Sequence, residues 1–217
     1  MRVVSLVPSV TETLRAWGVD PVGVTRFCEQ PDLPAVGGTK NPDVARIAGL
    51  APDLVVVDRE ENRREDAEAL AAAGLRVHAL HVTDLAGLDA QLDALADAVG
   101  VGRPGPTGAA DGGVGAAAVG PGALAVWVPI WRRPWMAIGA DTYATALLAA
   151  AGFAVVAAAP GRYPETTPAE AAAAGAAAVL APSEPDPFAE RHVAELSEVG
   201  PVALVDGRDL FWWGVRT

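Results

Sequence analysis

Short apolar runs alternate with stretches of helical periodicity along most of this chain, and this alternation constrains the fold more than any other feature. Runs rich in Val, Leu, Ile and Ala predict strands at Val3–Val7, Val22–Thr25, Leu54–Val57, Val77–Leu80, Leu124–Ile130, Ala154–Ala157, Ala178–Ala181 and Val202–Val205. The intervening periodicity predicts helices near residues 10–17, 42–50, 61–73, 84–99, 142–151, 168–174 and 187–197. Strands that alternate with helices are typical of mainly parallel sheets flanked by helices. The sequence therefore predicts an α/β protein.

The segment VVSLVPSVTETL at the start of the chain shows this pattern most clearly. It joins an apolar run to a helical pattern through Pro8. Ser9 and Glu12 have the spacing of a capping box, in which two side chains accept the free N–H groups of a helix N-terminus. The carboxyl end of a strand that leads into a helix is where α/β folds place ligand sites. We expect a functional loop here.

The middle of the chain has a different composition. Residues 100–122 contain 12 Gly or Pro, which disfavour both helix and strand. We interpret this stretch as an irregular connection that follows a helix at 84–99. The predicted organisation is an N-terminal α/β lobe at 1–83, a connecting helix plus Gly/Pro-rich linker at 84–122, and a C-terminal α/β lobe at 123–217. A ligand cleft is expected between the lobes, which a single helix joins.

Composition excludes several classes of partner. The formal net charge is −11, which argues against nucleic acid and against anionic membranes. The sequence has no apolar run of about 20 residues, so we expect no direct membrane insertion. Cys28 is the only cysteine, so no internal disulfide can form. His78 and His81 lie near the end of one predicted strand and are expected on different sides, so we predict no metal site.

Polar and aromatic residues gather after the predicted strands, and these are the candidate ligand-binding residues. The set consists of Ser9, Arg26, Phe27, Cys28, Thr39, Lys40, Glu60, Asn62, Trp131, Trp135, Tyr143, Trp212 and Trp213. The four tryptophans stand beside Pro, Arg or Gly, outside the apolar periodic runs. Tryptophan in such a setting is typical of a cleft wall or an interface.

Catalytic motifs give no positive signal. The sequence has no G-x-S-x-G elbow, no Walker A motif, no H-E-x-x-H pair and no Rossmann glycine fingerprint after the first strand. One enzymatic alternative stays open. It is a cytoplasmic enzyme on the same scaffold that uses Cys28 as nucleophile or soft ligand, with Glu60 or Glu12 as acid or base.

Several segments in order resemble one protein family. They are VVSLVPSVTETL, PVGVTRFCEQP, VGGTKNPDVARIAGLAPDLVVVDREENRRED, PIWRRPWMAIGADTY, RYPETTPAEAAAAGAAAVLAPSEPDPF and LVDGRDLFWWG. Together they resemble the class III periplasmic-binding-protein superfamily. The nearest part is the cobalamin-type, or helical-backbone metal receptor, group of ABC-transporter substrate-binding proteins. The resemblance covers nearly the whole chain outside residues 100–122.

The resemblance implies a non-catalytic binder that holds a corrinoid, another tetrapyrrole or a metal chelate between two lobes and requires no cofactor. It also implies an ABC transporter membrane component as a partner. Family members dock through one acidic residue per lobe, and the matching positions here are Ala45 and either Ala169 or Glu170. Half of that acidic pair is therefore expected.

The start of the chain bears on where the protein is located. The first core strand begins at Val3, which leaves no residues for a signal peptide. The chain as given is therefore expected in the cytoplasm. The alternative is a periplasmic or cell-surface receptor from which a leader has been removed.

Overall fold

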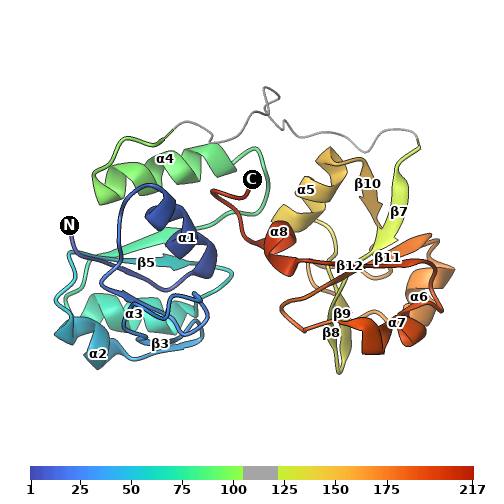
Figure 1. Cartoon of the computed structure of the whole chain (residues 1–217), viewed down its shortest axis with the longest axis horizontal. Coiled ribbons are helices and arrows are strands. Elements are labelled where there is room, and N and C mark those ends of the chain that lie inside the picture. The colour runs from blue at the N-terminus through green and yellow to red at the C-terminus, as the bar shows by residue number, and fades with distance from the viewer. Residues whose placement is uncertain (105–121) are drawn as a thin grey trace. The chain divides into compact units, whose positions relative to one another are not determined.

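The computed structural model describes residues 1–104 and 122–217, which form two compact units (Figure 1). Of the described residues, the first unit contains 1–82, 87–104 and 213–217, and the second contains 83–86 and 122–212. The chain thus returns to the first unit for its last five residues. Among the described residues, no helix combines the length and the apolar character needed to cross a bilayer.

The first unit is built on a parallel sheet of four strands in the order β2-β1-β5-β6. The strands are β1 (Val3–Ser5), β2 (Gly23–Val24), β5 (Leu54–Asp58) and β6 (Val77–Leu80). β5 lies in the interior of the sheet and is buried along its whole length. A continuous Val/Leu run of this kind is what a parallel strand with helices on both faces requires.

Helices cover both faces of this sheet (Figure 1). They are α1 (Pro8–Ala16), α2 (Val44–Gly49), α3 (Arg64–Ala72) and α4 (Leu88–Val99). Ile47 of α2 and Leu70 of α3 pack into the same core cluster as Val4, Val55 and Val57 of the sheet. The other face lies against α1 and α4. A short antiparallel pair, β3 (Gly37–Gly38) and β4 (Asn41–Pro42), makes a tight turn beside the sheet.

The second unit repeats this plan with a parallel sheet in the order β10-β7-β11-β12. Its strands are β7 (Leu124–Trp127), β10 (Phe153–Val155), β11 (Ala178–Pro182) and β12 (Val202–Val205). Its helices are α5 (Tyr143–Ala150), α6 (Pro168–Ala173), α7 (Glu190–Leu196) and α8 (Gly207–Phe211). One core cluster joins the sheet to α6 and α7, and a second joins it to α5 and α8. An antiparallel hairpin, β8 (Pro129–Arg132) and β9 (Trp135–Ala137), extends from this unit.

These elements confirm the α/β fold class and correct several details. The apolar run Leu124–Ile130 is two strands, because the chain leaves the sheet after Trp127 and enters the hairpin. The antiparallel hairpin and α8 were not predicted. α4 has 12 residues, fewer than the predicted helix at 84–99, and belongs to the first unit, although the sequence analysis assigned it to a connector. Most of the Gly/Pro-rich stretch at 100–122 lies outside the described residues.

The capping box predicted at Ser9 and Glu12 is wrong. The first helix begins at Pro8 with Val7 as the N-cap residue, and no side chain caps it. Proline is favoured at the first helical position because it lacks an N–H that would need a partner, so the helix starts one residue before Ser9. The helix expected at 142–151 is capped by the Thr142 hydroxyl, which accepts from the Thr145 backbone N–H. Asp141, directly before this cap, has a left-handed backbone with φ of 58°.

Candidate functional site

Most candidate residues of the first unit lie at one edge of its sheet. Because β1, β2 and β5 are parallel, their carboxyl ends meet at the same edge, where ligand sites of open α/β sheets occur. Ser9 follows β1, residues 26–28 follow β2, and Glu60 and Asn62 follow β5. The β3–β4 turn adds Thr39 and Lys40, since the Lys40 Nζ donates to the Glu60 carbonyl at 2.7 Å. We call these residues the carboxyl-edge cluster.

Phe27 is the exposed aromatic side chain of the carboxyl-edge cluster. Its side chain is 48% exposed, and the Arg26 guanidinium lies over its ring at 4.7 Å from the centroid. A side chain at the buried Gly38 would come within 3.2 Å of both Arg26 and Phe27. The glycine in the β3–β4 turn thus allows this turn to lie against the stacked pair. The arrangement presents a flat apolar surface beside a positive charge.

Asn62 positions its neighbours. It is buried, and its Nδ2 donates to the carbonyls of Thr39 at 2.8 Å and Leu6 at 3.2 Å. Its Oδ1 accepts from the backbone N–H of Asp58 at 2.9 Å. One amide therefore joins the ends of β1 and β5 to the β3–β4 turn. With both N–H donors already used, Asn62 holds the cluster together and offers no free donor to a ligand.

Two ionisable residues of this edge, Asp58 and His81, are not among the candidates that the sequence predicts. Asp58 ends β5 and is 1% exposed. One of its carboxylate oxygens accepts from the backbone N–H groups of Glu60 at 2.8 Å and Glu61 at 3.3 Å. The other has no hydrogen-bond partner among the described residues. Burial raises the pKa of this carboxyl group, and the backbone hydrogen bonds only partly oppose the rise.

His81 follows β6, and its Nε2 lies 3.5 Å from the Glu60 carboxylate. Both residues lie at the carboxyl ends of parallel strands, and this position could have identified them as candidates from the sequence. His78, on β6 itself, is half-buried, and desolvation lowers its pKa. Across residues 1–104 and 122–217, no group of three His, Cys, Asp or Glu side chains is arranged to hold a metal ion.

Cys28 is buried, with 2% of its side chain exposed. The hydroxyl groups of Thr11 and Thr25 contact its sulfur at 3.2 and 3.1 Å. Desolvation raises the pKa of the thiol, so the reactive thiolate is disfavoured. Glu12, one of its two suggested acid/base partners, is bound by Arg216 at 2.7 Å. This environment is typical of a structural cysteine, and the enzymatic alternative finds no support in it.

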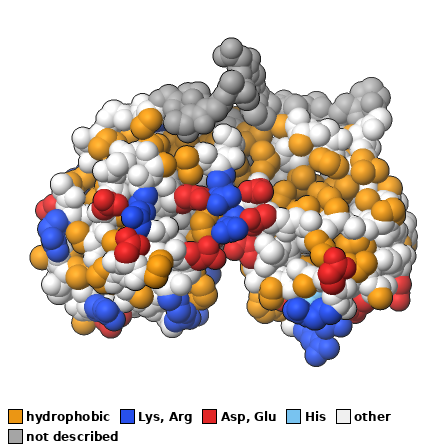
Figure 2. All heavy atoms as spheres, in the orientation of Figure 1, with side chains coloured by type: hydrophobic (Ala, Val, Ile, Leu, Met, Phe, Trp, Pro, Cys, Tyr) orange, Lys and Arg blue, Asp and Glu red, His pale blue; other side chains and the backbone are white. Residues whose placement is uncertain are grey.

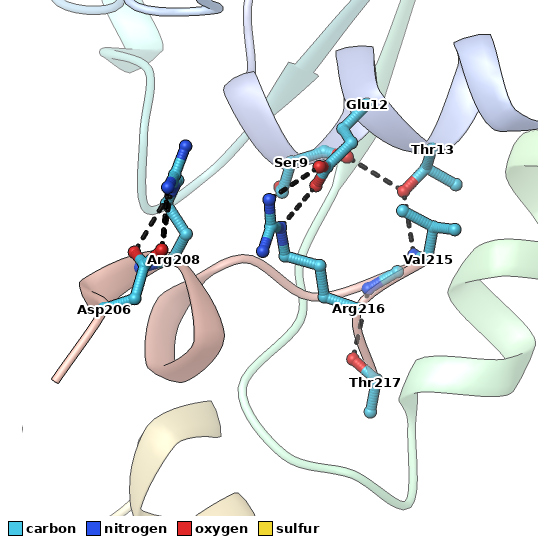
Figure 3. Close-up of polar contacts among 9 residues, drawn as sticks. Ser9, Glu12, Thr13, Asp206, Arg208, Val215, Arg216 and Thr217 are labelled. Carbon is cyan, nitrogen blue, oxygen red and sulfur yellow. Dashed lines mark hydrogen bonds and ion pairs between the residues drawn. The ribbon is translucent and has the colours of Figure 1, made fainter. Parts of the chain in front are cut away.

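The C-terminal end of the chain lies against α1, the helix that contains Ser9 (Figure 3). Ser9 is buried, and its carbonyl accepts from the Thr13 hydroxyl at 2.8 Å. The Thr13 oxygen in turn accepts from the backbone N–H of Val215 at 3.2 Å. The Arg216 guanidinium binds both oxygens of Glu12, at 2.7 and 2.8 Å. We call residues 213–217 the C-terminal strap. Trp213 within it is 6% exposed.

The candidate tryptophans of the second unit have different environments. Trp131 in the hairpin is 45% exposed, and its Nε1 donates to the Arg133 carbonyl at 3.2 Å. Trp135 packs against the core, stacked on Phe188 with ring centroids 6.0 Å apart and tilted against Trp127 at 5.7 Å. Trp135 therefore supports the hairpin, while Trp131 offers a ring to solvent.

The two remaining candidates in this unit are less exposed than Trp131. Tyr143, the first residue of α5, is buried, and Trp212, the C-cap residue of α8, is half-buried. Of the positions that the resemblance suggests for docking, Ala45 is exposed on α2, and Glu170 caps α6 through a capping box with Thr167. Its hydrogen bonds to Thr167 lower the pKa of the Glu170 carboxyl group.

The sequence of this chain is similar to those of known binding proteins over part of its length. A family model described as a periplasmic binding protein matches residues 3–103. The vitamin B12-binding proteins of Salmonella paratyphi A and Salmonella typhimurium are each 34% identical to this chain over 80 residues. That match covers 35% of this chain and only 30% of each relative.

Solved structures match over a much longer region. The periplasmic haem-binding protein RhuT of Roseiflexus sp. RS-1 aligns with 99% of this chain and 92% of its own, with a TM-score of 0.77 and 21% identity. The periplasmic vitamin B12-binding protein BtuF of Vibrio cholerae aligns with 99% of this chain and 91% of its own, with a TM-score of 0.76 and 15% identity. At these identities the likeness establishes the fold.

Proposed function

Because a periplasmic-binding-protein family model matches residues 3–103 and the fold is that of solved periplasmic binding proteins, we propose that the chain is a member of the class III periplasmic-binding-protein superfamily and a substrate-binding protein that holds a small molecule without transforming it. The ligand is a corrinoid, another tetrapyrrole or a metal chelate. The observation that carries the proposal is the carboxyl-edge cluster, which presents an exposed aromatic ring and cationic side chains at the ligand-binding edge of a parallel sheet. Flat macrocycles with polar substituents fit a surface of this kind.

A non-catalytic role agrees with the chemistry of the cluster. Cys28 is buried and hydrogen-bonded, Asn62 has both N–H donors engaged, and Glu60 is contacted by Lys40 and His81. These groups stabilise one another, whereas a catalytic site keeps its reactive groups accessible to substrate. The partner proposed from the family is the membrane component of an ABC transporter.

Isothermal titration calorimetry with cyanocobalamin, cobinamide and haemin tests the proposal directly. We expect at least one of them to bind with a dissociation constant in the micromolar range or tighter. Phe27→Ala is expected to weaken that binding about tenfold, because an aromatic contact contributes about 0.5–1.5 kcal/mol beyond its buried area. If none of the three binds at tens of micromolar, the proposed ligand class is wrong.

Tyr163→Ala provides a matched control. Tyr163 is 42% exposed and also lies beneath the guanidinium of the preceding arginine, 5.7 Å from its ring centroid. It belongs to the second unit and is not a candidate ligand residue. The Tyr163 variant should bind like the unmodified protein. Equal weakening in both variants would mean that Phe27 acts through general stability rather than by contact with the ligand.

The compartment is a separate proposal with a separate test. The structural relatives are described as periplasmic proteins, which supports an extracytoplasmic location. The alternative is a cytoplasmic location. Fractionation of cells that express the natural gene, followed by detection of the protein in each fraction, distinguishes the two locations.

A further inference from the structure

A hollow of about 330 Å³ opens on the second unit. The side chains that line it come from the β8–β9 hairpin, the loop before α7, and α7 itself, and they are Trp131, Arg132, Arg133, Asp186, Arg191 and His192. Figure 2 shows Lys or Arg side chains gathered with a His at the end of this unit where β8, β9 and α7 lie in Figure 1. The hollow carries three guanidinium groups and one carboxylate, although the chain as a whole has a net charge of −11.

The three guanidinium groups are not equally compensated. Arg132 is bound to Glu195 at 2.8 Å and lies over the ring of Trp135 at 5.9 Å, so its charge is paired. Arg133 is exposed and has no ion-pair partner among the described residues. Arg191 donates one N–H to the Pro187 carbonyl at 3.3 Å and likewise has no carboxylate within ion-pair distance in the described ranges. Arg133 and Arg191 thus lack an ion-pair partner within 4 Å, and Asp186 is the one carboxylate that lines the hollow beside them.

The remaining wall of the hollow supplies a neutral donor and an aromatic surface. The Nδ1 of His192 accepts from the Ala189 backbone N–H at 3.1 Å, which places the proton of the neutral ring on Nε2. Trp131 is held in place by its hydrogen bond to the Arg133 carbonyl while 45% of its side chain stays exposed. The charged groups that act on the ring of His192 are Arg191, Arg132, Asp186 and Glu195.

We propose that this hollow binds a carboxylate or phosphate group carried by a flat apolar molecule. Arginine presents a planar fork of N–H donors that matches either anion, and hydrogen bonds between charged groups are stronger than neutral ones. The exposed ring of Trp131 receives the apolar body to which the anion is attached. The inference rests on the proposed function and narrows it, because it requires that the small ligand carry at least one such anionic group.

The probe is 1-naphthoate, which combines a carboxylate with a flat aromatic body, measured by isothermal titration calorimetry on the full chain. We expect binding that weakens as sodium chloride is raised, because salt screens exposed charges. Arg133→Gln and Arg191→Gln should each weaken binding about fivefold, and the double variant about 25-fold, which follows from about 1 kcal/mol for each exposed ion pair. Inorganic phosphate should compete with naphthoate for the same site.

Two controls keep the test specific. 1-Naphthylmethylamine has the same aromatic body with a positive charge and should not bind. Arg76→Gln removes an exposed arginine at the start of β6 in the first unit and should leave naphthoate binding unchanged. Circular dichroism of each variant confirms that its fold is intact.

The outcomes separate this inference from the proposed function. No naphthoate binding at millimolar concentration, or binding that the two arginine substitutions leave unchanged, would overturn the inference even if cobalamin or haemin binds. Arginine-dependent naphthoate binding without any binding of the macrocycles would support the anion site and refute the proposed ligand class. Displacement of naphthoate by a bound macrocycle would support both.

Discussion

The C-terminal strap gives the sharpest prediction about stability. Trp213 is 6% exposed and is grouped with the first unit, although the residues directly before it belong to the second. Replacing a buried tryptophan by alanine costs about 3–5 kcal/mol, because packing is lost and a cavity remains. Trp213→Ala should therefore destabilise the first unit by about 4 kcal/mol, a large part of the total stability of a domain of this size.

Urea unfolding followed by far-UV circular dichroism measures the effect. With a slope of about 2 kcal/mol per molar urea, the midpoint of the first unit should fall by about 2 M. Trp131→Ala, at a tryptophan that is 45% exposed, is the matched control and should move the unfolding midpoint of the second unit only slightly. A Trp213 variant within about 0.5 kcal/mol of the unmodified protein would refute the idea that the strap is part of the first unit's fold.

Two milder substitutions test the polar contacts of the strap. Gly214 has a φ of 114°, and a Cβ there would lie 2.2 Å from the Thr13 hydroxyl oxygen. Gly214→Ala should therefore cost about 1–3 kcal/mol through backbone strain and steric clash. Arg216→Gln should cost at most about 1 kcal/mol, the usual range for a partly exposed ion pair. The reverse order of effects would mean that the ion pair to Glu12, rather than the backbone, holds the strap.

Three further predictions concern ionisable groups. Because burial raises the pKa of the Cys28 thiol, an alkylating reagent at neutral pH should modify it far more slowly in the native protein than in urea. Burial raises the folded-state pKa of Asp58, so the contribution of this carboxyl group to stability falls as the pH rises through that pKa. Asp58→Asn should therefore raise the stability at pH 7. The urea midpoint of this variant should depend less on pH than that of the unmodified protein. Desolvation, Arg191 and Arg132 lower the pKa of His192, so its ring is neutral at pH 7.5. Naphthoate binding should therefore tighten as the pH falls through the pKa of His192 in the unmodified protein and not in His192→Asn.

The predicted strands were largely correct because each is a short local run of β-branched and apolar residues. Val77–Leu80 and Val202–Val205 have the bounds that the sequence predicts, and β5 is only one residue longer than expected. β5 is buried along its whole length, and a strand that is covered on both faces must be apolar throughout, so its location is visible in composition alone. The same local signal fails at Leu124–Ile130, where only sheet pairing shows that the run divides into two strands.

The candidate residues after the strands of the first sheet lie together at one edge because parallel strands place their carboxyl ends together, and their role in ligand binding stays a prediction. Their individual roles were not predictable, since each depends on neighbours that are distant in the sequence. Asn62 was expected to bind a ligand, yet its amide bonds Thr39 and Leu6, 23 and 56 residues away. Likewise, Arg132 forms an ion pair with Glu195, 63 residues away, while Arg133 has no ion-pair partner among the described residues.

The sequence by itself determined the α/β class and the residues that gather at the carboxyl edge of the first sheet, because these depend on local apolar patterns and on which residues follow each strand. Only the tertiary structure decided which polar groups are satisfied and which are free. It brought Val215 and Arg216 onto α1, some 200 residues earlier in the chain, and gathered arginines around one hollow. Burial and charge pairing depend on long-range contacts, and no local pattern in the sequence encodes them.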